Sequence, residues 1–124
     1  MNMKTSIRHV GDVTLVDITG RIVFGEGSAS VHGTVSDLLN QGHRKILLNL
    51  GAVDYIDGMG LGSLVSAFAR AREQGGELKL FNLTNKVTDV LRITKLYTVF
   101  EIMKDEAVGV RSFGASTEAT AAAA

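Results

Sequence analysis

The sequence predicts an α/β sandwich whose sheet is mostly parallel. Short apolar runs rich in β-branched residues alternate with helical patterns, which is typical of parallel sheets with right-handed crossovers. Two further apolar runs at the start are separated only by Gly11-Asp12, which predicts an antiparallel hairpin at one side of the sheet. The length of 124 residues fits one domain of this kind.

The hairpin consists of two short β-branched, apolar strands. We predict the first at Ile7 to Val10 and the second at Val13 to Ile18. Gly20 is expected to end the second strand, since glycine weakens a strand interior.

A helix is predicted from Ser28 to Gln41, because its apolar residues recur at i, i+4, i+7 and i+8. Ser28 or Ser30 could cap its start through a side-chain oxygen, and Gly42 is placed to end it. The apolar face of this helix is made of Val31, Val35, Leu38 and Leu39.

The central strand and the clearest helix follow. Lys45 to Leu50 is a nearly continuous apolar run between helical patterns, which predicts a buried parallel strand. We expect residues 51–58 to turn into the helix, which ends at Gln74-Gly75-Gly76. The predicted buried face, at spacing i, i+3, i+4 and i+7, is made of Leu61, Leu64, Val65 and Phe68.

Four shorter elements and a tail complete the chain. They are a strand at Glu77 to Phe81, a helix at Asn85 to Ile93, a strand at Val99 to Met103 and a final helix at Asp105 to Phe113. We interpret residues 1–113 as a single domain. Residues 114–124 are Ala-rich and of low complexity, which predicts either disorder or an extension of the last helix.

Composition excludes several classes of protein. The 13 Lys and Arg balance the 13 Asp and Glu, so the formal net charge is zero and a nucleic-acid partner is not expected. Without cysteine the chain has no disulfide, thiolate metal site or thiol nucleophile. No stretch reaches the roughly 18 apolar residues of a membrane helix, and the start lacks an apolar signal region. We therefore expect a cytoplasmic protein without membrane insertion.

The chain offers no recognisable catalytic or metal site. His9, His32 and His43 are scattered along the sequence, without the ligand spacing of a metal centre. The strand-to-helix elbow reads Gly58-Met59-Gly60, with no nucleophile where a G-x-S-x-G serine would stand. We expect no enzyme activity and no cofactor. The glycines of residues 58–62 keep nucleotide binding as an alternative, although the Gly-Lys-Ser/Thr ending of a phosphate-binding loop is missing.

The start of the second predicted helix is the most informative place in the sequence. Asp57 is well placed as N-cap, with its carboxylate accepting from the free amide of Met59 or Gly60. At about 100° per residue, Met59 falls near solvent, on the side opposite the apolar face. An exposed methionine among glycines at a helix start is a plausible docking point, because methionine adapts to irregular surfaces. The other residues on that side are Ser63, Ser66 and Arg70.

The order of elements and several local segments resemble the STAS domain, the fold of the bacterial anti-sigma factor antagonists. The resemblance covers roughly residues 5–110. It implies a mixed, mostly parallel sheet with an N-terminal antiparallel hairpin and helices packed mainly on one face. The segments that carry it are Gly20-Arg21-Ile22, residues 46–50 with 53–57, Gly60-Leu61-Gly62 through Gly75-Gly76, and residues 91–96 with Phe100.

The resemblance implies partner switching. An antagonist of this family docks on an anti-sigma factor, often a serine protein kinase, and thereby releases a sigma factor. Phosphorylation of a Ser or Thr in the pattern Asp-Ser-Ser/Thr-Gly-Leu ends the docking, because phosphate adds nearly two negative charges at the contact. Residues 57–61 here read Asp-Gly-Met-Gly-Leu, so Met59 stands where the phosphoacceptor would be.

Three interpretations of this departure remain open. The protein could be an antagonist that is not switched off at this place, or Ser63 could be a weak substitute phosphoacceptor. It could instead dock on a different assembly, such as a lipid-transport or sensor complex. The partner is expected to be an anti-sigma factor or serine kinase, and a homodimer is left open. The predicted docking residues are Asp57, Gly58, Met59, Gly60, Gly62, Ser63 and Ser66, with Arg21, Asp54 and Tyr55 nearby.

Overall fold

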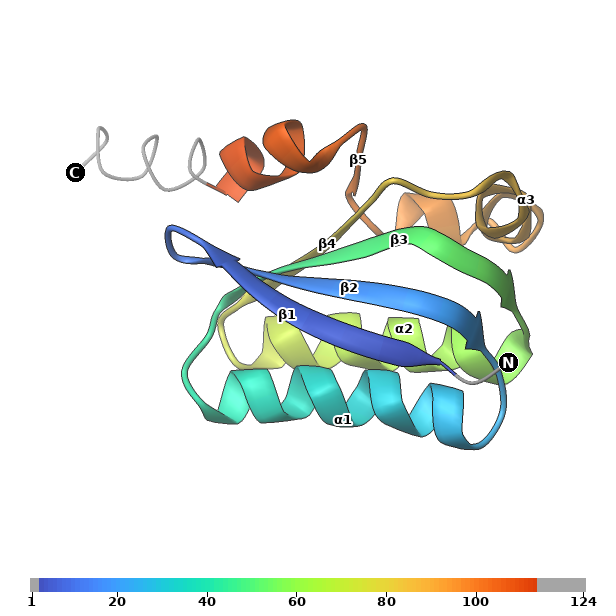
Figure 1. Ribbon diagram of the computed structural model, residues 1–124, viewed down its shortest axis with the longest axis horizontal. Coiled ribbons are helices and arrows are strands. Elements are labelled where there is room, and N and C mark those ends of the chain that lie inside the picture. The colour runs from blue at the N-terminus through green and yellow to red at the C-terminus, as the bar shows by residue number, and fades with distance from the viewer. Residues whose placement is uncertain (1–2, 114–124) are drawn as a thin grey trace.

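The computed structural model describes residues 3–113 and confirms the predicted fold class. Five strands form one sheet in the order β1-β2-β3-β4-β5 (Figure 1). β1 runs antiparallel to β2, and every other neighbouring pair is parallel. The strands are β1 (Lys4–Val10), β2 (Val13–Ile22), β3 (Lys45–Ile56), β4 (Glu77–Phe81) and β5 (Ile102–Met103).

Helices cover the two faces of the sheet unequally. Helices α1 and α2 lie side by side below one face, and α3 lies at the end of β3 (Figure 1). A C-terminal helix, residues 106–113, lies over the other face. The bounds are α1 (Glu26–Asn40), α2 (Gly58–Glu73), α3 (Asn85–Ile93) and a short 3-10 helix, η1 (Leu96–Thr98).

The sheet separates a large apolar core from a small one. Because successive strand residues point to opposite faces, Val16 and Ile18 of β2 enter the large core, while Val13 and Leu15 enter the small one. The large core includes residues of α1, α2 and α3. The small core lies under the C-terminal helix and includes Phe113. Burial on both faces explains why the central strand has a nearly continuous apolar sequence.

Three strands run further than the sequence predicts. β1 starts at Lys4 rather than at Ile7. β2 does not end at Gly20 but continues to Ile22, and β3 continues to Ile56 through most of the predicted turn at residues 51–58. The ladder between them persists because register shifts beside Gly20 absorb the irregularity. Gly51 lies close to another segment, since a Cβ there would lie 2.0 Å from Nδ2 of the Asn82 side chain, which would have to move for a larger residue.

Other boundaries are partly as predicted. The first helix starts at Glu26, so neither Ser28 nor Ser30 is its cap; Gly25 precedes it without a side-chain cap, at φ 94°. Gly42 and Gly75 follow their helices at φ 94° and 78°, as predicted. The strand predicted at Val99 to Met103 is shorter, because only the last two residues pair with β4. The expected tail, residues 114–124, lies outside the described part of the chain.

Candidate functional site

Asp57 joins the start of α2 to the loop that follows β2. Its Oδ1 accepts from the amide of Gly60 at 2.8 Å, which confirms the predicted N-cap. Its Oδ2 accepts from the amide of Phe24 at 3.0 Å. One carboxylate therefore holds two segments that are far apart in sequence, and it fixes the position of Phe24 beside the helix start.

The ionised form of Asp57 is favoured in the folded protein. The hydrogen bond from the Gly60 amide, followed by that from the Phe24 amide, lowers the pKa of the Asp57 carboxyl below its ordinary value. The folded pKa is thus below the unfolded one. The resulting contribution to stability is present above the unfolded pKa and is lost as pH falls through the folded pKa.

We expect Asp57→Asn to lower the free energy of unfolding at pH 7, because the amide side chain offers one acceptor oxygen in place of two. The difference from wild type should start to shrink below about pH 4, where the carboxyl of the unfolded chain takes up a proton, and should disappear once the folded carboxyl is protonated as well. Urea unfolding at several pH values between 7 and 3 measures this. Asp54→Asn is the control, because Asp54 is exposed and its side chain makes no hydrogen bond or ion pair within residues 3–113. A pH-independent difference for Asp57→Asn would contradict the assignment.

Two large apolar side chains beside this carboxylate face solvent. Met59 is 56% exposed, so its predicted exposure is confirmed, and Phe24 is 72% exposed. Sequence reasoning missed Phe24, because it lies outside any helical or strand periodicity. The available signal was a bulky aromatic residue next to Gly25, in a loop where no packing pattern accounts for it.

Met59 lies at one wall of a shallow groove between α1 and α2. Gly58 and Gly62 face open space, since a Cβ built on either meets no atom within 4 Å. Small side chains dominate the lining, which leaves the groove open to a partner. The lining residues are Ser28, Ala29, His32 and Gly33 from α1, and Gly58, Met59, Gly62, Ser63 and Ser66 from α2.

Two predicted docking residues face the interior instead. A Cβ on Gly60 would lie 1.8 Å from the carbonyl oxygen of Ile22, so this glycine is required by packing against β2. Ser63 is only 8% exposed, and its hydroxyl donates to the Gly60 carbonyl at 2.6 Å. The helix wheel that placed Ser63 towards solvent was therefore wrong, because α2 also packs against α1. Burial disfavours Ser63 as a phosphoacceptor.

The remaining predicted residues lie around the rim of the same end of the sheet. Arg21 and Tyr55 are paired across β2 and β3, and the Arg21 guanidinium carbon lies 5.1 Å from the Tyr55 ring centroid. Their neighbours Ile22 and Ile56 enter the large core, so Arg21 and Tyr55 point to the other face. Asp54 is exposed. These three residues do not line the groove between the helices.

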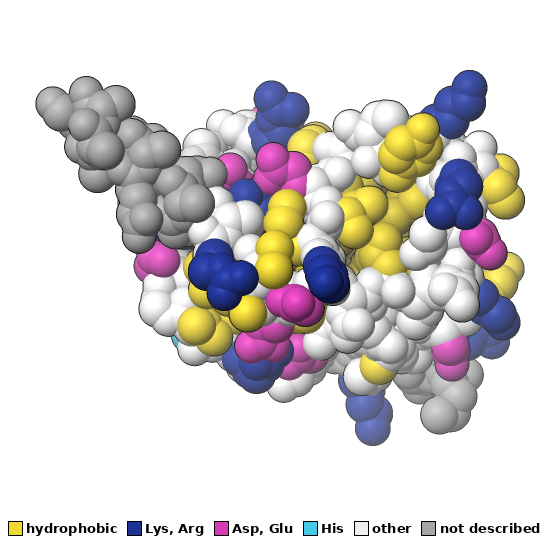
Figure 2. Space-filling model, turned by 90° about the horizontal axis from the view of Figure 1, so that it is seen from above, with side chains coloured by type: hydrophobic (Ala, Val, Ile, Leu, Met, Phe, Trp, Pro, Cys, Tyr) yellow, Lys and Arg dark blue, Asp and Glu magenta, His cyan; other side chains and the backbone are white. Residues whose placement is uncertain are grey.

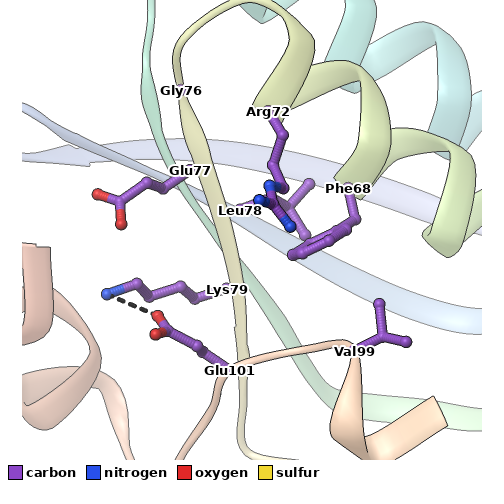
Figure 3. A pocket seen from close by; sticks show the side chains of 8 residues that line it. All are labelled: Phe68, Arg72, Gly76, Glu77, Leu78, Lys79, Val99 and Glu101. Carbon is purple, nitrogen blue, oxygen red and sulfur yellow. Dashed lines mark ion pairs between the residues drawn. The ribbon is translucent and has the colours of Figure 1, made fainter.

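A second hollow lies at the edge of β4, and its buried lysine, Lys79, is paired with neighbouring side chains. Figure 3 shows Lys79 and Glu101 turned towards each other, with Arg72 and Phe68 on the other side of the strand. Lys79 is 3% exposed; its Nζ lies 2.9 Å from a Glu101 carboxylate oxygen and 4.5 Å from the Phe113 ring centroid. A buried ammonium needs such partners, so we interpret this cluster as structural.

Apolar side chains also gather in a hollow on the side away from α1 and α2, as Figure 2 shows. Tyr97 and Ile102, two of its lining residues, are exposed. The hollow is lined by Leu83, Thr88, Leu91, Arg92, Tyr97 and Ile102. The molecule therefore has a second exposed apolar surface, apart from the groove beside Met59.

The histidines are less scattered than expected. His9 and His43 lie side by side, with ring centroids 5.2 Å apart. Within residues 3–113, no group of three or more His, Asp or Glu side chains is arranged to hold a metal ion. At the start of α2 the Gly60 amide already donates a hydrogen bond to the Asp57 carboxylate. This negative group disfavours the binding of a nucleotide phosphate there.

The fold and the exposed helix start define a small α/β domain that presents an apolar surface beside a capped helix. Residues 4–108 match the STAS domain family model, and the chain belongs to this family. It is a STAS domain of the anti-sigma factor antagonist type. No helix in the described range is both long enough and apolar enough to cross a membrane.

The relatives agree with this assignment. The chain is 29% identical over 111 residues to the anti-sigma-B factor antagonist of Bacillus subtilis, covering 90% of this chain and 100% of that protein. It is 32% identical over 110 residues to the anti-sigma-B factor antagonist of Listeria monocytogenes, covering 86% and 93%. The crystal structure of a candidate anti-sigma factor antagonist from Thermotoga maritima superposes with a TM-score of 0.80 at 27% identity, covering 87% and 92%.

Proposed function

We propose that this protein is a non-catalytic binding module that docks on an anti-sigma factor of the serine-kinase type and thereby releases a sigma factor. The docking surface is the helix-start surface, which we define as Phe24, Gly58, Met59, Gly62 and Ser66. The observation that carries the proposal is the pair of exposed apolar residues, Phe24, whose amide donates to Asp57, and Met59, in the helix turn that Asp57 caps.

The roles within this surface follow from size and exposure. Met59 fills an apolar pocket of the partner, and burying its side chain fully contributes at most about 1.5–3 kcal/mol. Gly58 and Gly62 let the partner backbone approach, since nothing lies where their side chains would be. Asp57 acts as a positioning residue through its two backbone hydrogen bonds.

The partner is not released by phosphorylation at the position that the family pattern indicates. Residues 57–61 contain no hydroxyl group, and the nearest serine along α2, Ser63, is buried and bonded to Gly60. We therefore expect docking on such a partner to persist in the presence of its kinase activity and ATP as long as Ser66, the exposed hydroxyl of this surface, is not modified.

We expect Met59→Glu to weaken binding by about tenfold or more, because the apolar contact is replaced by a charge. Calorimetric titration against the anti-sigma factors encoded in the same genome measures this, with mass spectrometry after incubation with ATP as a second readout. Met59→Leu should bind almost as tightly as wild type, since leucine conserves volume and polarity.

Ile93→Glu is the matched control, because it makes a similar change at an exposed apolar residue outside the helix-start surface. It should leave the affinity unchanged. Equal affinity of Met59→Glu and wild type would exclude this surface, and phosphate on Ser63 would exclude the unswitched antagonist. Binding only to components of a lipid-transport complex would replace the proposed partner.

A further inference from the structure

We propose that Met59 is a redox-sensitive modification site, and that its oxidation to methionine sulfoxide by a peroxide releases the partner. The inference rests on the proposed function, because it assigns a regulatory chemistry to the helix-start surface. It places a reversible thioether modification where the family pattern has a phosphorylated hydroxyl.

The exposure of Met59 sets it apart from the other described methionines. Met59 is 56% exposed, whereas Met3 is buried at 9% and Met103 is half-buried against the small core. Gly58 and Gly62, on the same turn, carry no side chain that could shield the sulfur. Since oxidation of methionine follows its accessibility to the oxidant, Met59 is expected to react first.

The chemistry requires only a peroxide. A lone pair of the Met59 sulfur attacks one peroxide oxygen, the O–O bond breaks as the S–O bond forms, and the second oxygen leaves as water. The sulfur loses two electrons, the peroxide is reduced, and no further reactant is needed. Methionine sulfoxide reductases reverse the reaction.

The modified side chain no longer fits an apolar pocket. Sulfoxide formation converts a flexible apolar group into a polar one with a strong acceptor oxygen. Burying that oxygen without a donor is unfavourable, as is burying any unpaired polar group. The free protein tolerates the change, because the Met59 side chain lies at the surface and contributes no large part of either core.

Two measurements test the proposal. Purified protein is exposed to hydrogen peroxide for increasing times, and peptide mapping by mass spectrometry follows the addition of one oxygen to each methionine. Met59 should be oxidised about tenfold faster than Met3 and Met103. The oxidised protein is then titrated with the anti-sigma factor that binds the untreated protein. Affinity should fall about tenfold and return after treatment with methionine sulfoxide reductase.

Two variants distinguish a failure of the redox proposal from a failure of the docking proposal. Met59→Leu should bind the partner and become insensitive to peroxide, while Met59→Gln should reproduce the weak binding of the oxidised protein without any treatment. If the oxidised protein binds as tightly as the untreated protein, or if Met3 or Met103 reacts first, the redox site is excluded and the docking proposal stands. If neither untreated wild type nor Met59→Leu binds any anti-sigma factor, the docking proposal itself fails.

Discussion

Gly60→Ala is expected to destabilise the protein by about 3 kcal/mol or more. The new Cβ would lie 1.8 Å from the carbonyl oxygen of Ile22 and 2.6 Å from its carbonyl carbon. These are backbone atoms of β2, so no change of rotamer relieves the clash. Either α2 moves away from the sheet or β2 bends, and both disturb the large core. Urea unfolding followed by circular dichroism measures the loss.

Gly62→Ala provides the control within the same helix turn. Gly62 is exposed, a Cβ there meets no atom within 4 Å, and alanine is the better helix former. This variant should therefore be roughly 1 kcal/mol more stable than wild type. Equal stability of the two alanine variants would show that α2 does not press against Ile22 in solution, and the described packing at the helix start would be wrong.

Phe113→Ala is expected to cost about 3–5 kcal/mol, the range for truncating a fully buried aromatic residue. Phe113 has no exposed surface and lies in the small core with Leu15, Leu47 and Phe81. Its ring also covers the Lys79 ammonium at 4.5 Å. Truncation opens a cavity and removes that cover, so both effects act in the same direction. Thermal and urea unfolding measure the change.

The loss of Phe113 should be felt most in the C-terminal helix, because Phe113 is the fully buried residue that this helix contributes to the small core. Gly109 lies close over Leu47, and Glu106 accepts from Arg8 at 2.8 Å. Hydrogen exchange should show faster opening of residues 106–113 in the variant than of α2. Phe24→Ala is the matched control, since the same truncation at an exposed site should leave stability almost unchanged. Equal losses for both variants would contradict the two-core description.

Local patterns predicted most of the fold, because the signals for it are strong and close in sequence. The Asp57 cap was predictable because a carboxylate precedes the free amides of a helix start. The left-handed conformation of Gly75 was predictable because glycine adopts it readily after a helix. The extension of β3 to Ile56 could not be predicted in this way. Its glycine and aspartate residues are typical of turns, whereas pairing with β2 and the burial of Val53 and Ile56 in the large core accompany the extended strand.

The surface that we propose for docking was predictable only in part, for a similar reason. Hydrophobic periodicity identifies the face of α2 that meets the sheet, but small residues such as Ser63 and Ala67 give little signal for the face that meets α1. Phe24 was missed because its place beside Asp57 depends on a hydrogen bond between segments 33 residues apart. Contacts between distant segments of this kind become visible only in three dimensions.

The first turn of α2 places two opposite constraints on adjacent positions. Gly60 is fixed by sterics against Ile22, while Met59, one residue earlier, is exposed to solvent. Mutation can therefore alter the residue that we propose a partner contacts without touching the one that holds the helix in place. If the proposed function holds, paralogous copies of such a gene can diverge in partner choice through exposed positions such as 24 and 59, at little cost to the stability of the fold.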